Sequence, residues 1–185
     1  MKVLAVSGSV RDTSHNSRLL REAAELLAPE VEVELYDGLK AVPPYDEDDD
    51  VGDGPAGAAH FRAALAGADA VLFATPEYNS SVPGQLKNAL DWASRPLATN
   101  PLRNVPAGVM GASNGAFGAV WAQAELRKVL AAMGARVVGS EVPVGRAQAR
   151  LDEHGRLLDA ETEERVRELL DALQAAVAER EQVAA

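Results

Sequence analysis

The sequence predicts an α/β fold in which a five-stranded parallel sheet, in the strand order 2-1-3-4-5, is covered by helices on both faces, giving a three-layer sandwich. Two observations lead to this prediction. Short apolar runs alternate five times with stretches of helical periodicity, the pattern of right-handed strand–helix–strand units. The 185 residues, 47% of them hydrophobic, contain no linker or internal repeat, so we expect a single domain over residues 1–185.

The first half of the chain begins with an apolar strand at residues 2–7, followed by a helix that Pro29 ends. Residues 31–35 alternate Val and Leu with Glu, which predicts a strand with one wet face near a sheet edge. Five consecutive acidic residues follow at 46–50. They lack the central Gly and final Glu of a calcium loop, so we expect a solvated acidic loop.

The second half continues the same alternation up to the last helix. Residues 70–74 form a short, wholly apolar run, as a strand buried on both faces requires. The other segments are predicted as a helix at 55–66, a helix at 83–94, a strand at 105–110, a helix ending near 133, a strand at 136–140, an irregular stretch at 143–155 and a helix at 161–178.

Composition excludes several classes of function. The chain has 18 basic and 28 acidic residues, a net charge of −10, and no basic stripe, so we expect neither nucleic acid nor an anionic membrane as partner. Cysteine is absent, and the three histidines show no metal-pair spacing, so we expect no disulfide, thiolate or metal site. No apolar run reaches the ~20 residues of a membrane span, and we expect a cytoplasmic protein.

The loop after the first strand, residues 8–17, has the features of a phosphate cradle. Gly8 lets the backbone turn sharply and approach a ligand closely. The following helix begins here, where free N–H groups and the helix dipole favour an anion. Neither a P-loop nor a G-x-G-x-x-G motif is present. Asp12 would repel a phosphate unless its side chain turns outward. The polar side chains available to an anion are Ser9, Arg11, Ser14, Ser17 and Asn16.

Two further loops complete the predicted site. Residues 75–84 follow the third strand and combine two prolines and a glycine with an aromatic ring, and residues 111–118 form a polar, glycine-rich loop after the fourth strand. In the order 2-1-3-4-5 the first, third and fourth strands are neighbours, so the three loops converge on one crevice at the carboxyl edge. A ligand that touches all three would be phosphorylated at one end and planar at the other.

Four motifs resemble the NADPH-dependent FMN reductase family, which has a flavodoxin-like fold and includes quinone, azo-dye and chromate reductases. They are Gly8-Ser9-x-Arg11-x-x-Ser14-x-Asn16, Pro76-Glu77-Tyr78-Asn79, Pro83-Gly84-x-Leu86-Lys87-Asn88-x-x-Asp91-Trp92 and Ser113-x-Gly115-x-x-Gly118. The resemblance extends from residue 1 to about residue 173. It implies an FMN-dependent NAD(P)H oxidoreductase that passes hydride from NADPH or NADH through FMN to a small-molecule electron acceptor.

The resemblance also implies the site residues. It places the FMN phosphate on Ser9, Arg11, Ser14 and Asn16. It places the ring and ribityl chain against Pro76, Glu77, Tyr78 and Asn79, and against Ser113, Asn114, Gly115 and Phe117. His15 joins the site at a position where the family more often has an aromatic or small residue. No protein residue is expected to act as a catalyst, because FMN carries the chemistry.

Family resemblance implies a homodimer as well, with a tetramer as the alternative. The helix after Pro83-Gly84 lies in the subunit interface of the family's dimers. An interface role for Leu86, Leu90 and Trp92 therefore stands beside a core role.

Two other functions compete with this interpretation. Gly111-Ala112-Ser113-Asn114-Gly115 satisfies the G-x-S-x-G pattern of a hydrolase nucleophile, and Asp152 and His154 follow in triad order. Against a serine hydrolase, the Asp and His are only two residues apart, and the loop around Arg11 would have no role. The second alternative is a flavin-binding electron carrier without enzymatic activity, whose acidic surface would suit a basic redox partner.

Overall fold

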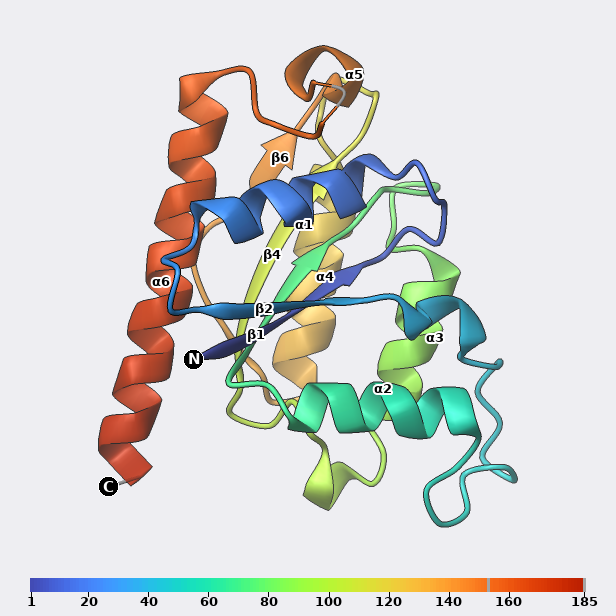
Figure 1. Ribbon diagram of the computed structural model, residues 1–185. Helices are drawn as coiled ribbons and strands as arrows, with labels where there is room; N and C mark the ends of the chain where they lie inside the picture. Colours follow the sequence, from blue (N-terminus) through green and yellow to red (C-terminus); the bar gives the residue numbers. More distant parts are fainter. Residues whose placement is uncertain (153, 185) are drawn as a thin grey trace.

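The computed structural model describes residues 1–152 and 154–184. It shows a parallel sheet between two layers of helices (Figure 1). Its strands are β1 (Lys2–Ser7), β2 (Glu32–Tyr36), β3 (Ala70–Ala74), β4 (Pro106–Ala112), β5 (Arg136–Val137) and β6 (Val142–Val144). The α-helices are α1 (His15–Leu26), α2 (Ala56–Ala66), α3 (Gly84–Ala93), α4 (Val120–Ala132), α5 (Ala147–Arg150) and α6 (Ala160–Ala184), and the 3-10 helices are η1 (Gly38–Ala41) and η2 (Leu97–Thr99). In this part of the chain no helix is both long and apolar enough to cross a membrane.

The strand order is β2-β1-β3-β4-β5, and every pairing is parallel. Val3 of β1 pairs with Val33 of β2 on one side and with Ala70 of β3 on the other. This pairing puts the carboxyl ends of β1, β3 and β4 next to one another. The predicted order and three-layer architecture are confirmed.

The fifth strand position differs from the prediction. Residues 136–140 were expected to form one strand, but Gly139 has a φ of +64°, which interrupts the extended chain. The strand resumes as β6, which pairs with the last residues of β4. Arg127 donates to the carbonyls of Val138 and Gly139 at 3.2 and 2.8 Å, so the carbonyl groups at the break are satisfied. The prediction of an irregular stretch at 143–155 is therefore wrong at residues 143–144, which belong to β6, and at residues 147–150, which form α5.

Two apolar cores hold the layers together. Helices α1 and α6 cover one face of the sheet, and α2, α3 and α4 cover the other (Figure 1). The predicted apolar face of α6 is buried. In α3, Leu86, Leu90 and Trp92 are each 0% exposed within one chain, and Trp92 Nε1 donates to the carbonyl of Pro43 at 2.8 Å. They are core residues, so the interface alternative for them is wrong.

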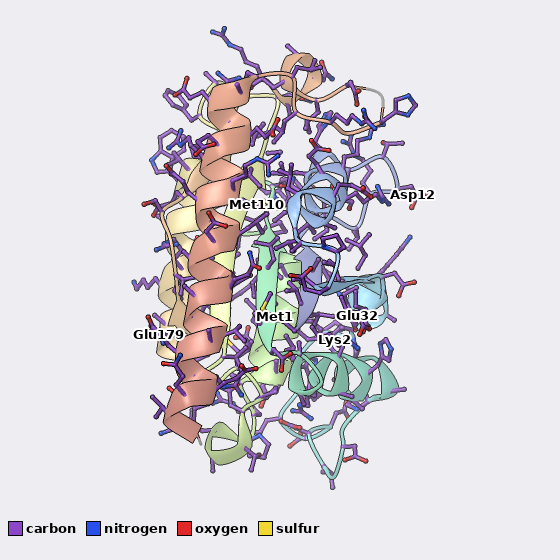
Figure 2. All side chains as sticks on the ribbon, turned by 60° about the vertical axis from the view of Figure 1, so that its left-hand side comes forward. Met1, Lys2, Asp12, Glu32, Met110 and Glu179 are labelled. Carbon is purple, nitrogen blue, oxygen red and sulfur yellow. The ribbon has the colours of Figure 1, made fainter. Side chains whose placement is uncertain are left out.

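In the amino-terminal half, ion pairs form at the acidic segment and at the β2 edge. Residues 46–49 are exposed as predicted, but Asp50 pairs with Arg62 at 2.8 Å and is largely buried. Lys2 of β1 reaches Glu34 at 2.7 Å and Glu32 at 3.9 Å across the β1–β2 pairing (Figure 2). As expected for an edge strand, β2 has only one buried residue.

Candidate functional site

The loops after β1, β3 and β4 converge on one crevice of about 240 Å³ at the carboxyl edge of the sheet. We call it the three-loop crevice. Its lining residues are Ser9, Arg11, Ser14, His15, Asn16, Pro76, Glu77, Tyr78, Ala112, Ser113 and Asn114. Ten of the predicted site residues are thus brought together, and three, Asn79, Gly115 and Phe117, lie outside the lining.

Gly8 allows the first loop to pack against the second. Its N–H donates to the carbonyl of Ala74 at 2.8 Å, which extends the β1–β3 pairing by one step. A Cβ at this position would lie 2.9 Å from Leu86 and 3.3 Å from Pro76. A larger residue would therefore crowd Leu86 of α3 and Pro76 of the second loop.

The start of α1 presents backbone N–H groups that suit an anion. Ser14 Oγ accepts from the amides of Asn16 and Ser17 at 3.1 and 3.3 Å, so Ser14 is the N-cap, and its hydroxyl proton remains available to a ligand. Within residues 1–152 and 154–184, the amides of Val10, Asp12 and Thr13 have no protein acceptor. Together with the helix dipole they favour a bound anion.

The two charged side chains of this loop point in different ways. Arg11 is exposed, and its guanidinium donates to the carbonyl of Thr13 at 3.2 Å while lining the crevice. Asp12 lies at the outer edge of the molecule (Figure 2) and does not line the crevice. The carboxylate therefore lies outside the crevice, as a phosphate bound there would require.

Asn16 has a structural role that the sequence did not indicate. Its Nδ2 donates to the carbonyl of Ala112 at 3.0 Å, and its Oδ1 accepts from the amide of Ala112 at 2.9 Å. The side chain is 2% exposed. Asn16 therefore ties the first loop to the third, and because its Nδ2 has a second N–H, its contact with a phosphate stays a prediction.

His15 presents an unsatisfied polar atom. Its Nδ1 is buried and makes no hydrogen bond among the described residues. Burial lowers the pKa of His15 below 6.5, as do the positive charges of Arg11 and Arg18, while a hydrogen bond with Asn114 opposes the shift. The imidazole is therefore neutral at pH 7. An orphaned nitrogen inside a polar crevice fits a ligand that supplies the missing hydrogen bond.

The second loop is a tight reverse turn. The backbones of Tyr78 and Ser81 exchange hydrogen bonds of 3.0 and 3.1 Å, and Asn79 and Ser80 between them have φ values of +54° and +59°. Two consecutive residues with positive φ give a type I′ turn, for which Asn is favoured. Asn79 therefore shapes the loop without lining the crevice, and Tyr78, 54% exposed, lies at the rim.

Glu77 links the second loop to the first turn of α4, the helix that follows the third loop. Its Oε2 accepts from the amides of Trp121 and Ala122, both at 3.1 Å. The residue before α4, Ala119, has a φ of +59° and offers no side-chain cap. Glu77 thus caps α4 from a separate loop, a role that sequence reasoning missed. The only signal was negative: no Ser, Thr, Asp or Asn stands where α4 begins.

The third loop is fixed by buried contacts on its far side. Gln123, 0% exposed, donates to the carbonyl of Gly118 at 2.9 Å and accepts from the amide of Val142 at 3.0 Å. Phe117 is 63% exposed and packs edge-on against Trp121, with ring centroids 5.0 Å apart. Phe117 therefore lies on the surface outside the crevice lining.

The residues of the proposed hydrolase triad do not come together. Asp152 Oδ1 accepts from the amides of His154 and Arg156, both at 2.8 Å, so it closes a turn. These backbone hydrogen bonds lower the pKa of Asp152. Among the residues that the structure describes, neither Asp152 nor His154 lines the crevice that holds Ser113. The serine hydrolase alternative is not supported.

These features define a flavodoxin-like fold with a polar crevice at the carboxyl edge of its sheet. A mutant flavodoxin from Pseudomonas aeruginosa shares the fold, with a TM-score of 0.60 at 19% identity over 94% of this chain and 99% of that one. The family model for NADPH-dependent FMN reductase matches residues 1–149, and the chain belongs to that family. It is accordingly an NAD(P)H-dependent oxidoreductase with FMN as cofactor.

Named relatives match nearly end to end. The NAD(P)H-dependent FMN reductase PA1204 of Pseudomonas aeruginosa is 44% identical over 175 residues, covering 94% of each chain. The NADPH:quinone oxidoreductase of Arabidopsis thaliana is 37% identical, covering 95% of this chain and 91% of that protein. FerB, a flavoenzyme NAD(P)H:(acceptor) oxidoreductase from Paracoccus denitrificans, superposes with a TM-score of 0.84 at 31% identity over 96% of this chain and 97% of that one.

Proposed function

We propose that this protein reduces quinone-like small molecules with electrons from NAD(P)H, using FMN bound in the three-loop crevice. One observation carries the proposal: three loops from neighbouring strands meet at the start of α1. Among the described residues, backbone N–H groups there and the buried Nδ1 of His15 have no protein hydrogen-bond partner. Relatives named as quinone reductases support the choice of acceptor.

The phosphate end of FMN would lie against the first loop. Ser9 and the hydroxyl of Ser14 are positioned as neutral donors there, and Arg11 adds a permanent positive charge with a fork of N–H groups. His15 Nδ1 would gain its missing hydrogen bond from the same nucleotide.

The ring end would lie between the second and third loops. Glu77 and Tyr78 of the second loop and Ser113 and Asn114 of the third line the same crevice, so they would orient the flavin from two sides and leave one face open. When bound, FMN accepts hydride from the nicotinamide and passes electrons to the acceptor. Because Asn16 ties the first loop to the third and Glu77 ties the second loop to α4, the chain holds this geometry before the cofactor arrives.

A homodimer in the cytoplasm, with a tetramer as the alternative, completes the proposal. Tyr78, Phe117 and Trp121 are 54%, 63% and 49% exposed around the crevice, and a second copy would cover them. Light scattering coupled to gel filtration tests this: the wild type should elute as a dimer or tetramer and Trp121→Asp as a smaller species. A monomeric wild type would contradict the assembly.

Absorbance and steady-state kinetics test the function itself. The purified protein should be yellow, or should take up FMN in preference to FAD, and anaerobic NAD(P)H should bleach the bound flavin. Because donor and acceptor use the same open face in turn, double-reciprocal plots with a quinone should be parallel. A colourless protein that does not bind added FMN would overturn the proposal, and intersecting lines would require a separate acceptor pocket.

A further inference from the structure

A second hollow, of about 370 Å³, adjoins the loop that follows β1. We call it the β2-edge hollow. Its walls come from β1, β2, α1 and η1, and its volume is in the usual range for small-molecule sites. Ser9 and Arg11 line both this hollow and the three-loop crevice, so the two spaces share a wall. Ser17, one of the polar side chains expected to face an anion, lines only the hollow. The proposed FMN site therefore accounts for neither this space nor Ser17.

The hollow is lined by apolar side chains, two of which are open to solvent. Val10 and Leu35 are 45% and 42% exposed, and Leu20 and Leu39, which also line the hollow, are buried. Because β2 is an edge strand, no further strand of the described residues covers this side. A flat and rigid aromatic ring would bury this apolar area at a small cost in conformational entropy. The apolar lining therefore favours a ligand with an aromatic body.

The charged groups of the hollow leave an excess of one positive charge. Arg11, Arg21 and Lys40 line it, against the carboxylates of Asp12 and Asp37. Among the residues that the structure describes, none of the three cations forms an ion pair. This excess matches a ligand with a single negative charge, whereas the two carboxylates would oppose a phosphate dianion. A carboxylate is such a group, and its two oxygens match the fork of a guanidinium.

The three cations come from separate walls of the hollow. Arg21 lies one turn beyond Ser17 on α1, so both side chains are on the same face of that helix. Lys40 comes from η1, and Arg11 from the loop that the hollow shares with the crevice. The guanidinium of Arg11 is exposed, and its partner is the carbonyl of Thr13 in its own loop. Arg11 is thus the cation that can reach a ligand in either space, and it can hold only one of them at a time.

We propose that the β2-edge hollow binds an aromatic carboxylate, with Arg21 and Lys40 holding the carboxylate and Leu35 contacting the ring, and that this ligand weakens FMN binding by drawing Arg11 out of the crevice. Coupling between two sites is reciprocal, so FMN weakens the binding of the aromatic acid by the same factor. The inference rests on the proposed function, because the coupling acts through the FMN phosphate. It assigns a regulatory ligand to three residues that do not line the three-loop crevice.

The bicyclic acid 2-naphthoate is the probe that tests the hollow directly. Calorimetric titration into the wild type should show binding, and the uncharged 2-naphthylmethanol should bind roughly tenfold more weakly. Arg21→Ala and Lys40→Ala should each weaken naphthoate binding roughly tenfold, as expected for the loss of one charge-assisted contact. Both variants should bind FMN like the wild type when naphthoate is absent. Lys128→Ala, which removes an exposed cation from α4 on the other face of the sheet, is the matched control and should bind naphthoate like the wild type.

Flavin fluorescence measures the coupling between the two sites. As naphthoate is raised to saturation, the apparent Kd for FMN should rise roughly tenfold and then level off, a factor typical of two coupled sites. The Kd for riboflavin, which lacks the phosphate, should not change. In Arg11→Ala the Kd for FMN should no longer respond to naphthoate.

The outcomes separate this inference from the proposed function. If naphthoate does not bind, or binds equally well to Arg21→Ala and Lys40→Ala, the inference alone is overturned. The same holds if the Kd for FMN does not respond, or if it rises without levelling off, since the acid would then occupy the crevice itself. Failure of the wild type to bind FMN would instead overturn the proposed function, and the naphthoate titrations would still decide whether the hollow takes an aromatic acid.

Discussion

Replacing Glu77 by alanine tests whether one carboxylate couples the second loop of the crevice to the start of α4. The substitution removes the acceptor for the amides of Trp121 and Ala122 at the start of α4, where Ala119 supplies no replacement cap. Loss of an N-cap costs about 0.5 to 2 kcal/mol. Loss of a negative charge at a helix N-terminus adds roughly 0.3 to 1 kcal/mol, at the lower end here because the site is partly exposed.

A value near 1.5 kcal/mol is therefore expected for the loss in the free energy of unfolding. For a chain of this size it corresponds to a fall of roughly 3 to 6 °C in Tm. The amides of Trp121 and Ala122 should also exchange hydrogen faster, and the Kd for FMN and for riboflavin should rise because the second loop is no longer held to the start of α4. Calorimetry, hydrogen exchange and flavin fluorescence measure these three effects.

Two matched variants make the test specific. Glu77→Gln keeps an oxygen that can accept from the same amides, so it should recover most of the lost stability and flavin affinity. Glu125→Ala removes an exposed carboxylate from the same helix and should leave both unchanged. The reasoning fails if Glu77→Ala unfolds like Glu125→Ala and its α4 amides exchange at the wild-type rate.

Three further predictions concern the crevice. Arg11→Ala should raise the Kd for FMN more than Ser9→Ala, because contacts to charged groups are worth about 1.5 to 3 kcal/mol against ~1 for neutral ones; equal fluorescence titrations of Arg11→Ala and wild type would show that Arg11 does not reach the phosphate. The pKa of His15 is lower in the folded than in the unfolded chain, so the unfolded chain takes up the proton first and stability should fall as the pH drops below 6.5. Urea unfolding should show a weaker pH dependence in His15→Gln, and identical slopes would refute this. Ser113→Ala should keep most quinone reductase turnover at saturating FMN, and the wild type should hydrolyse acyl esters no faster than an unrelated protein; esterase activity lost in the variant would contradict this assignment.

The fold could be predicted because each element has its own hydrophobic period. The buried strand at 70–74 appears as an uninterrupted apolar run, and the edge strand β2 as an alternation with Glu. The split of the last strand could not be predicted from local pattern. Val137 and Val142 are equally apolar, and the interruption depends on the backbone at Gly139 and on contacts from Arg127 in a different helix.

The site was predictable at the level of its loops but less so at the level of single side chains. Glycine, serine and proline clusters after three strands marked where the crevice lies. The roles of Asn16 and Glu77 depend on backbone partners 96 and 44 or 45 residues away, respectively, and no local pattern encodes such pairings. The sequence accordingly indicated Asn16 only as a ligand donor and gave no sign of the structural tie that its amide makes.

The two edges of the sheet bear on how copies of this protein can meet. On one side, β2 carries Glu32 and Glu34 beside Lys2, and on the other the fifth position is broken into β5 and β6. A charged edge and a short, interrupted edge are both poor templates for adding a strand from another molecule. The fold is therefore protected from edge-to-edge growth into continuous sheets, and helical faces and loops are left as the surfaces through which copies can associate.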